Sequence, residues 1–353
     1  MVKKRQPTGE AAAIPTAPRP DKAARVRSRP RIALLSNPKS TGNLAQLPRI
    51  REYCAEHPDI FHYEVEHAHQ IGQAMRIIAQ VRPKVLVING GDGTVQAALT
   101  ELYNGGHFGL EKPPVAVLPS GKTNLIALDL GARGDPIETL ERLIFLAQSD
   151  LAPYTVAREL IALRHGVPGH DDKPVIGMFL GGAGLADIML YCRDKIYPLG
   201  LPNGLAHTIT GLALFFKMLL GMKSRHLPPD PKPLAFTVRN QKHAISGRFA
   251  LMAVTTLEKL LLSGELGGER RGALKLIAVE EKLSSVLRAF YAALVGTLGR
   301  SHVRGVHFEE TDEITIEGDS SRMILDGETF SAETGRPIRL SPATPLSFVK
   351  LAA

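Results

Sequence analysis

Residues 85–94 read Val-Leu-Val-Ile-Asn-Gly-Gly-Asp-Gly-Thr, and this stretch decides the fold. Its first four residues are a continuous apolar run, which is typical of a buried parallel strand. The run ends at Gly90–Thr94, and a helical pattern follows from about Val95 to Tyr103. The glycines allow close backbone approach to a phosphate, and amides at a helix start attract anions. Gly-Gly-Asp-Gly alone also suits a plain turn. In this chain, however, the loop follows a strand and precedes a helix, and that order predicts a nucleotide site. There Thr94 can cap the helix, and Asp92 can hold a metal or a ribose.

Strands and helices alternate on both sides of this loop. Short apolar runs predict four strands, at Ile32–Leu35, Phe61–Val65, Val85–Ile88 and Val115–Leu118. Further helical patterns cover Leu44–Glu56, Ile71–Ile78 and Ile137–Ala147. Such alternation predicts a parallel sheet with helices on both faces, and ligands of such sheets bind beyond the carboxyl ends of the strands. Three of the four predicted strands end there in small, polar loops that contain glycine, so one site built from three loops is expected.

The pattern changes after about residue 150. Strand-like runs separated by turn residues are predicted at Tyr154–Leu163, Val175–Leu180, Leu234–Val238, Phe249–Thr255, Leu274–Val279, Ile314–Glu317, Met323–Leu325 and Leu346–Leu351. They indicate an antiparallel sandwich. Two helices interrupt it, at about Leu205–Leu220 and Leu283–Leu298. We expect their apolar faces to pack in the core, with a lipid-facing surface as the alternative. The predicted organisation is a tail over 1–30, an α/β nucleotide-binding domain over 31–150 with a parallel sheet, and a C-terminal antiparallel β-sandwich domain over 151–353.

The basic charge of the chain lies mostly in the predicted tail. The net charge of the chain is +8, and residues 1–30 hold eight basic and two acidic side chains, which leaves +2 for the rest. This distribution argues against a basic nucleic-acid groove in the fold. A disordered, solvated arm is expected, with attraction to anionic headgroups as the alternative. Cys54 and Cys192 have no metal-ligand spacing and favour a reducing compartment. The most apolar run, Ile209–Met222, contains a lysine and is shorter than the ~20 residues of a membrane-spanning helix.

Two further loops follow predicted strands at the same sheet edge. Asn37–Asn43 supplies hydroxyls and Lys39, which could hold phosphates, although such residues are common in loops. Pro119–Asn124 contains Gly-Lys-Thr, as a Walker A motif does. That motif would need glycine at position 116, which is Ala116 within the predicted strand, so we reject it. In the sandwich, Asp326-Gly327-Glu328 lies between apolar runs and by itself is an ordinary hairpin turn.

Taken together, these four segments resemble the diacylglycerol kinase catalytic-domain superfamily, in its bacterial lipid kinase branch with diacylglycerol, sphingosine and ceramide kinases. The resemblance runs from about Arg31 to Lys350. The family pattern of Asn-Pro-x-Ser-Gly, Gly-Gly-Asp-Gly-Thr, Pro-x-Gly-Thr-x-Asn-Asp and Asp-Gly-Glu is similar to the segments at Asn37–Ser40, Gly90–Thr94, Pro119–Asn124 and Asp326–Glu328. The resemblance implies a nucleotide domain, a sandwich domain and a site in the cleft between them.

The resemblance also implies an activity, which is ATP-dependent phosphorylation of a hydroxyl on a lipid such as diacylglycerol, a sphingoid base or ceramide. Asp92 would support the nucleotide and Mg²⁺, and a carboxylate of Asp326 or Glu328 would accept the proton of the lipid hydroxyl. The residues implied for ATP are Asn37, Pro38, Lys39, Ser40, Thr41, Gly90, Gly91, Asp92, Gly93, Thr94, Gly121, Lys122, Thr123 and Asn124. A cytoplasmic protein is expected, with peripheral contact at the inner face of the membrane.

The chain departs from the family pattern at several positions. Thr41 replaces the glycine of the first motif, with Gly42 one place later, and Leu125 replaces an acidic residue near the metal. Arg271 occupies the likely acidic position of an accessory Mg²⁺ site, which we therefore predict to be absent. These departures keep a weak or inactive nucleotide- or lipid-binding protein open as an alternative. NAD kinase is another, since it shares the Gly-Gly-Asp-Gly motif.

Lys122 occupies the position of a family threonine, and we hypothesise that its charge partly replaces that of a cation at the phosphates. Lys122→Ala should then raise the KM for ATP, because a positive charge near the polyphosphate is lost. Steady-state kinetics at varied ATP concentration test this, and an unchanged KM would rule the hypothesis out.

Overall fold

The computed structural model describes residues 31–121, 124–166, 173–196, 229–239, 243–257, 259–260, 263–265, 272–299 and 301–351. The predicted helix at Leu205–Leu220, the loop residues Lys122 and Thr123, Arg271 and the tail lie outside these ranges. Among the described helices, none has the length and apolar character needed to cross a bilayer.

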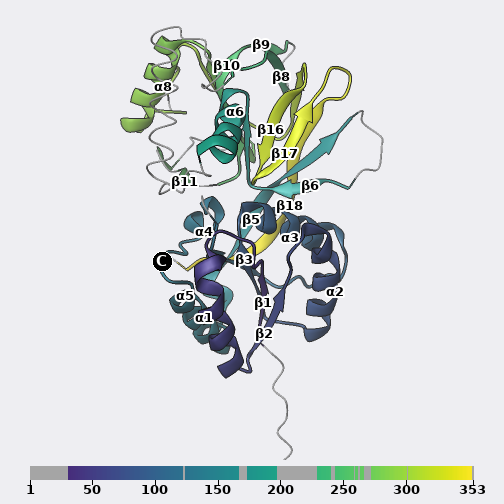
Figure 1. Ribbon diagram of the computed structural model, residues 1–353. Helices are drawn as coiled ribbons and strands as arrows, with labels where there is room; N and C mark the ends of the chain where they lie inside the picture. The colour runs from purple at the N-terminus through teal and green to yellow at the C-terminus, as the bar shows by residue number, and fades with distance from the viewer. Residues whose placement is uncertain are drawn as a thin grey trace, which may run out of the picture.

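The first half of the chain forms parallel strands between helices (Figure 1). In chain order the elements are β1 (Ile32–Ser36), α1 (Asn43–Glu56), β2 (Ile60–Glu64), η1 (Ala68–Gln70), α2 (Ile71–Val81), β3 (Val85–Gly90), α3 (Asp92–Asn104), β4 (Val115–Pro119), α4 (Leu125–Asp129), α5 (Pro136–Gln148) and η2 (Ala152–Tyr154). Strands β1, β2, β3 and β4 pair in parallel in the order β2-β1-β3-β4. Helices α1 and α5 lie on one side of them and α2 and α3 on the other (Figure 1). The predicted parallel α/β half is confirmed.

The second half is built mostly of antiparallel strands. The strands are β5 (Thr155–His165), β6 (Val175–Gly177), β7 (Phe179–Gly182), β8 (Leu234–Val238), β9 (Ile245–Gly247), β10 (Phe249–Thr255), β11 (Lys259–Leu260), β12 (Ser263–Glu265), β13 (Leu274–Glu280), β14 (Val306–Thr311), β15 (Ile314–Gly318), β16 (Ser321–Leu325), β17 (Glu328–Ala332) and β18 (Ile338–Val349). The helices are α6 (Gly184–Tyr191), η3 (Cys192–Ile196) and α8 (Leu283–Leu294). A six-stranded antiparallel sheet has the order β14-β13-β10-β7-β16-β17, and β11 pairs with β12 alone.

The other antiparallel strands continue the parallel sheet. Strand β18 pairs with β4 at Phe348↔Val115 and with β5 over most of its length, and the sheet runs on through β15, β8 and β9. One hydrophobic core packs the helices against the parallel strands. A second core draws side chains from this sheet and from the six-stranded one, among them Phe236, Leu276 and Leu340, so the two sheets form the predicted sandwich. The boundary at residue 150 stays a prediction.

Two predicted elements differ from the structure in informative ways. The run Val175–Leu180 is not one strand, because it divides at Met178 into β6 and β7, which belong to different sheets. Helix α8 forms as predicted but turns its large apolar side chains outward, so the expectation of core packing for this face is wrong. Tyr291 and Leu294 are 69% and 65% exposed.

Candidate active site

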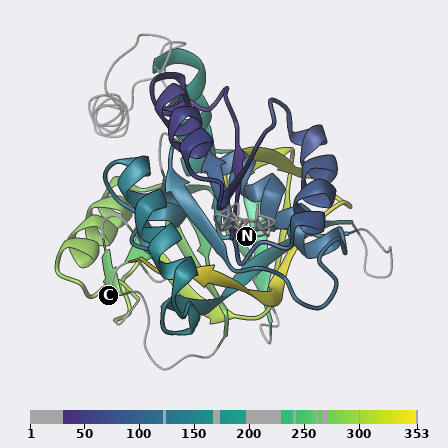
Figure 2. The same cartoon turned by 90° about the horizontal axis from the view of Figure 1, so that it is seen from below.

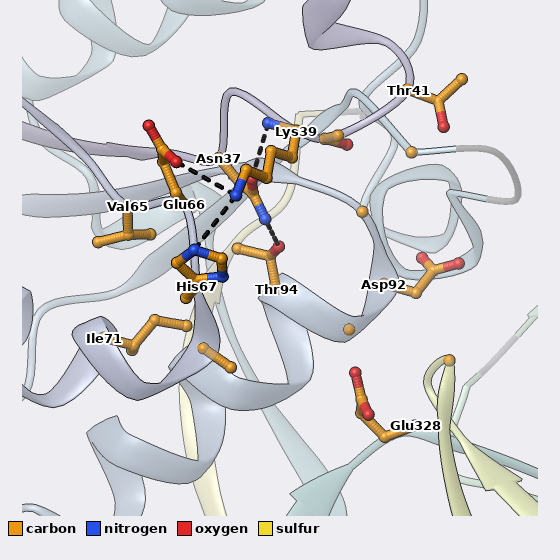
Figure 3. A pocket seen from close by; sticks show the side chains of 16 residues that line it. Asn37, Lys39, Thr41, Val65, Glu66, His67, Ile71, Asp92, Thr94 and Glu328 are labelled. Atoms are coloured by element: carbon orange, nitrogen blue, oxygen red, sulfur yellow. Dashed lines mark hydrogen bonds and ion pairs between the residues drawn. The ribbon is translucent and has the colours of Figure 1, made fainter.

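A pocket of about 430 Å³ lies where the parallel sheet meets the sandwich. Its walls come from the ends of β1, β2, β3 and β4 and from the turn between β16 and β17. Residues lining it are Asn37, Lys39, Ser40, Thr41, Val65, Glu66, His67, Ala68, Ile71, Gly91, Asp92, Gly93, Thr94, Gly121, Gly327 and Glu328. Segments almost 300 residues apart in the sequence therefore share one pocket, as Figure 3 shows.

The loop after β3 is shaped for close approach to other groups. Gly91 is the N-cap of α3, so the first turn of the helix opens at the pocket. A Cβ added at Gly90 would lie 2.7 Å from the Cβ of Thr94. The expected cap by Thr94 is wrong, since no side chain caps this helix. Thr94 lies within the first turn, where its hydroxyl accepts a hydrogen bond from Asn37 Nδ2 at 2.8 Å (Figure 3).

The loop after β1 is tied to the loop after β4 by one carbonyl. Ser120 O accepts hydrogen bonds from Ser40 Oγ at 2.7 Å and from the Gly42 amide at 3.0 Å. A Cβ at Gly42 would lie 2.6 Å from that same oxygen. Only glycine fits this approach, which makes Gly42 the position of this loop where a side chain is excluded.

The third loop is held by its own asparagine. Asn124 has a left-handed backbone with φ of 55°, and its side chain bonds both the amide and the carbonyl of Gly121. Asn124 thus shapes the loop instead of lining the pocket. Pro38 and Gly90 also lie outside the lining. Leu125 begins α4 and packs against the hydrophobic core, where a carboxylate would be desolvated.

The hairpin turn from the sandwich meets the loop after β3. A Cβ at Gly93 would approach Glu328 Oε1 to 2.8 Å, and one at Gly327, whose φ is +96°, would approach the Gly93 amide nitrogen to 3.3 Å. The exposed Glu328 side chain points toward the first turn of α3 (Figure 3). Two glycines facing each other therefore let the backbones come together and place a carboxylate at the helix start.

Asp326 differs from Glu328 in its surroundings. It is buried, and its two carboxyl oxygens accept hydrogen bonds from the amides of Met178 at 2.7 Å and Phe179 at 3.0 Å. Its own amide donates to Phe179 O, so the turn is anchored at the junction of β6 and β7. Burial raises the pKa of this carboxyl to about 8, and the negative charge of Asp92 adds to the rise. Asp326 does not line the pocket.

One wall of the pocket was missed by the sequence analysis. Val65, Glu66, His67, Ala68 and Ile71 follow β2 at the same sheet edge. The segment contains no glycine and gave no loop signal, although its position after a parallel strand could have revealed it. Lys39 Nζ lies 3.2 Å from a Glu66 oxygen and 3.2 Å from His67 Nε2, so this wall also orients the lysine (Figure 3).

The described acidic side chains at the pocket could serve Mg²⁺ together with a substrate. Among the described residues, no group of three or more His, Cys, Asp or Glu is placed to hold a metal ion. Asp92 and Glu328 both face the pocket. Mg²⁺ commonly binds through one or two carboxylates plus substrate phosphates, so this donor set fits a nucleotide-bound Mg²⁺.

Comparison with known proteins agrees with this geometry. Residues 31–156 match the family model of the diacylglycerol kinase catalytic domain, which confirms the resemblance for this part of the chain. This part of the chain is therefore similar to a catalytic domain of the kinase type. No curated protein matches the sequence significantly.

Solved structures extend the likeness to both halves. A proposed diacylglycerol kinase from Bacillus anthracis str. Sterne is 16% identical, with a TM-score of 0.60 over 91% of this chain and 97% of that chain. A diacylglycerol kinase from the same organism is 14% identical, with a TM-score of 0.57 over the same shares. At these identities the likeness is one of fold.

Gly42→Ala should separate the first and third loops, because its Cβ would strike the backbone of Ser120. Two hydrogen bonds to Ser120 O are at risk, worth about 0.5–1.5 kcal/mol each. We expect the free energy of unfolding to fall by roughly 1–3 kcal/mol and nucleotide binding to weaken. Urea denaturation and calorimetry with an ATP analogue measure both. Gly72→Ala is the control, since its nearest neighbour is the end of the Glu101 side chain at 3.4 Å. Equal behaviour of the two variants would contradict the assignment.

The buried Asp326 should make stability depend on pH. The folded protein keeps the Asp326 proton up to about pH 8, whereas an unfolded aspartate, with a pKa near ~3.9, has released it. The folded state then binds more protons than the unfolded one, so the free energy of unfolding falls as pH rises from about 4 to about 8. Asp326→Asn cannot titrate and should flatten this slope. Parallel slopes for both proteins in urea denaturation at pH 5, 6.5 and 8 would exclude the effect.

Proposed function

We propose that this protein is an ATP-dependent lipid kinase, which transfers the γ-phosphoryl group of ATP to a hydroxyl of a lipid alcohol such as diacylglycerol, a sphingoid base or ceramide. The observation that carries the proposal is the meeting of Glu328 with the glycine-rich loop at Gly93. It joins a phosphate-type loop and a carboxylate in one pocket, as phosphoryl transfer requires.

The phosphates of ATP are proposed to lie against the first turn of α3 and the loops after β1 and β4. Amides at the start of a helix carry partial positive charge, and here Gly91 and Gly93 have no side chains to block approach. Lys39 lines the same pocket and adds a positive charge. The wall formed by Val65, Ala68 and Ile71 supplies an apolar surface, which we assign to the adenine ring.

Glu328 is proposed to accept the proton of the lipid hydroxyl. The hydroxyl oxygen forms a bond to the γ-phosphorus, the bond from that phosphorus to the oxygen bridging to the β-phosphate breaks, and ADP leaves with that oxygen. The proton passes to the Glu328 carboxylate. Asp326 stays a predicted catalytic residue, but both its oxygens already accept backbone amides, which favours a positioning role. Mg²⁺ held by Asp92 and the phosphates would neutralise charge on the transferred group.

The direct test is incubation with γ-labelled ATP, Mg²⁺ and lipid alcohols dispersed in detergent micelles. The proposal expects label in a lipid and ADP in equal amount. ATP binding by calorimetry without labelled product from any acceptor would instead favour a binding protein with a kinase fold. Label in NAD, supplied as a separate acceptor, would favour NAD kinase.

Glu328→Gln should lower kcat by about 10²–10⁴-fold, because a positioned base contributes that much to proton transfer. Binding of an ATP analogue should stay within a few-fold of the parent, since the loops after β1, β3 and β4 are unchanged. Glu333→Gln is the matched control, as an exposed glutamate beyond the far end of β17, and should leave kcat unchanged. If Glu328→Gln kept full activity, the base would have to be another residue.

A further inference from the structure

Helix α8 presents its largest apolar side chains to solvent. Leu287, Phe290, Tyr291 and Leu294 are between 48% and 69% exposed, and Val295 next to the helix end is 55% exposed. The first four fall at spacings of three and four residues, which places them on one face of the helix. Figures 1 and 2 both show α8 at the periphery of the molecule. Contiguous exposed patches of this kind mark interaction surfaces.

The inner face of α8 is made of smaller residues. Val286 and Ala289 pack against Ile277 and Val279 of β13 and against Val306. Ser285 and Ala292 are buried as well. A helix whose only role is to cover a sheet would turn its large apolar side chains toward the sheet, and α8 does the reverse. Small residues seat the helix, and large residues that would stabilise a core remain outside.

The charged residues around the exposed face of α8 are mostly basic. From Lys282 to Ser301 the sequence contains no aspartate or glutamate. Arg288 and Arg304 are exposed beside the face, and the Arg288 guanidinium donates to Arg304 O at 3.3 Å. In the sequence, the acidic residues nearest the helix precede its start, where Glu280 pairs with Lys282 and Glu281 follows Glu280. Apolar side chains with arginines beside them suit the boundary of a bilayer that has anionic headgroups.

We propose that the exposed face of α8, formed by Leu287, Phe290, Tyr291, Leu294 and Val295, docks the protein on an anionic membrane. The inference rests on the proposed function in one respect, since a lipid acceptor is supplied from a membrane. A protein partner fits less well, because these five side chains are far fewer than the 20–30 residues that each side of a standard protein interface contributes. The docking is peripheral and involves no spanning helix.

The sequence contains no tryptophan, so a single introduced tryptophan reports on its own site. In Phe290→Trp the indole should shift its emission to the blue and be quenched by brominated lipids when vesicles of phosphatidylcholine and phosphatidylglycerol are added to the full chain. Phe145→Trp, at an exposed position of α5, is the matched control and should show neither change. Equal responses at the two positions, or none at Phe290→Trp, would overturn the proposal.

A loss-of-binding series completes the test. Leu287→Ser/Phe290→Ser/Leu294→Ser should bind these vesicles at least tenfold more weakly in sedimentation, whereas Leu44→Ser/Leu110→Ser/Phe145→Ser, at still more exposed positions, should bind like the parent. Arg288→Gln/Arg304→Gln should reduce the dependence of binding on salt and on anionic lipid. Unchanged vesicle binding by the first triple variant would overturn the proposal. The proposal would also be overturned if that variant, unlike the control variant, lost a self-association of the protein and still bound vesicles like the parent.

The outcomes separate this inference from the proposed kinase activity. Vesicle binding is measured without ATP, so it can succeed even if no lipid is phosphorylated. The triple variant at Leu287, Phe290 and Leu294 should keep the activity of the parent on acceptors in detergent micelles. A variant that loses activity there, with vesicle binding intact, would assign the face to the reaction and not to docking.

Discussion

The carboxyl group of Asp326 is the anchor on which the arrangement of the pocket depends. By accepting the amides of Met178 and Phe179, it fixes the turn between β16 and β17 at the point where the chain passes from one sheet to the other. Glu328 is only two residues further along the chain, so the anchored turn also fixes where Glu328 lies. Burying a carboxyl is unfavourable unless its hydrogen bonds are satisfied, and two backbone donors meet that requirement here.

The loops around the pocket approach their neighbours closely because glycines, which have no side chains, lie at the points of contact. Gly42 faces the carbonyl of Ser120 at a distance that a Cβ would not permit, and a Cβ at Gly93 would lie 2.8 Å from Glu328 Oε1. The three loops and the turn can therefore surround a ligand with backbone amides and a few charged groups. At 14–16% identity, the similar solved structures share the fold with this chain.

The sequence predicted the parts of the molecule that follow from local pattern. The buried strands of the parallel half have continuous apolar runs, and Gly90–Thr94 lies between such a run and a helical pattern, which together predict a loop of close approach. Contacts between residues far apart in the sequence could not be predicted from local patterns. Thr94 has the chemistry of a cap but bonds Asn37, which lies 57 positions earlier, and Val65 and Ile71 join the pocket only through sheet order. The outward turn of α8 escaped prediction because the helical period identifies an apolar face without showing which side of the helix meets β13.

Strand β18 has a consequence for how the protein forms. It supplies the outer neighbour of β4 and the partner of β5, yet it is translated after all the other described strands. Before β18 is synthesised, β4 lacks this outer neighbour, and exposed strand edges invite pairing with other chains. The strand order β2-β1-β3-β4-β18 can therefore be completed only after β18 has been synthesised.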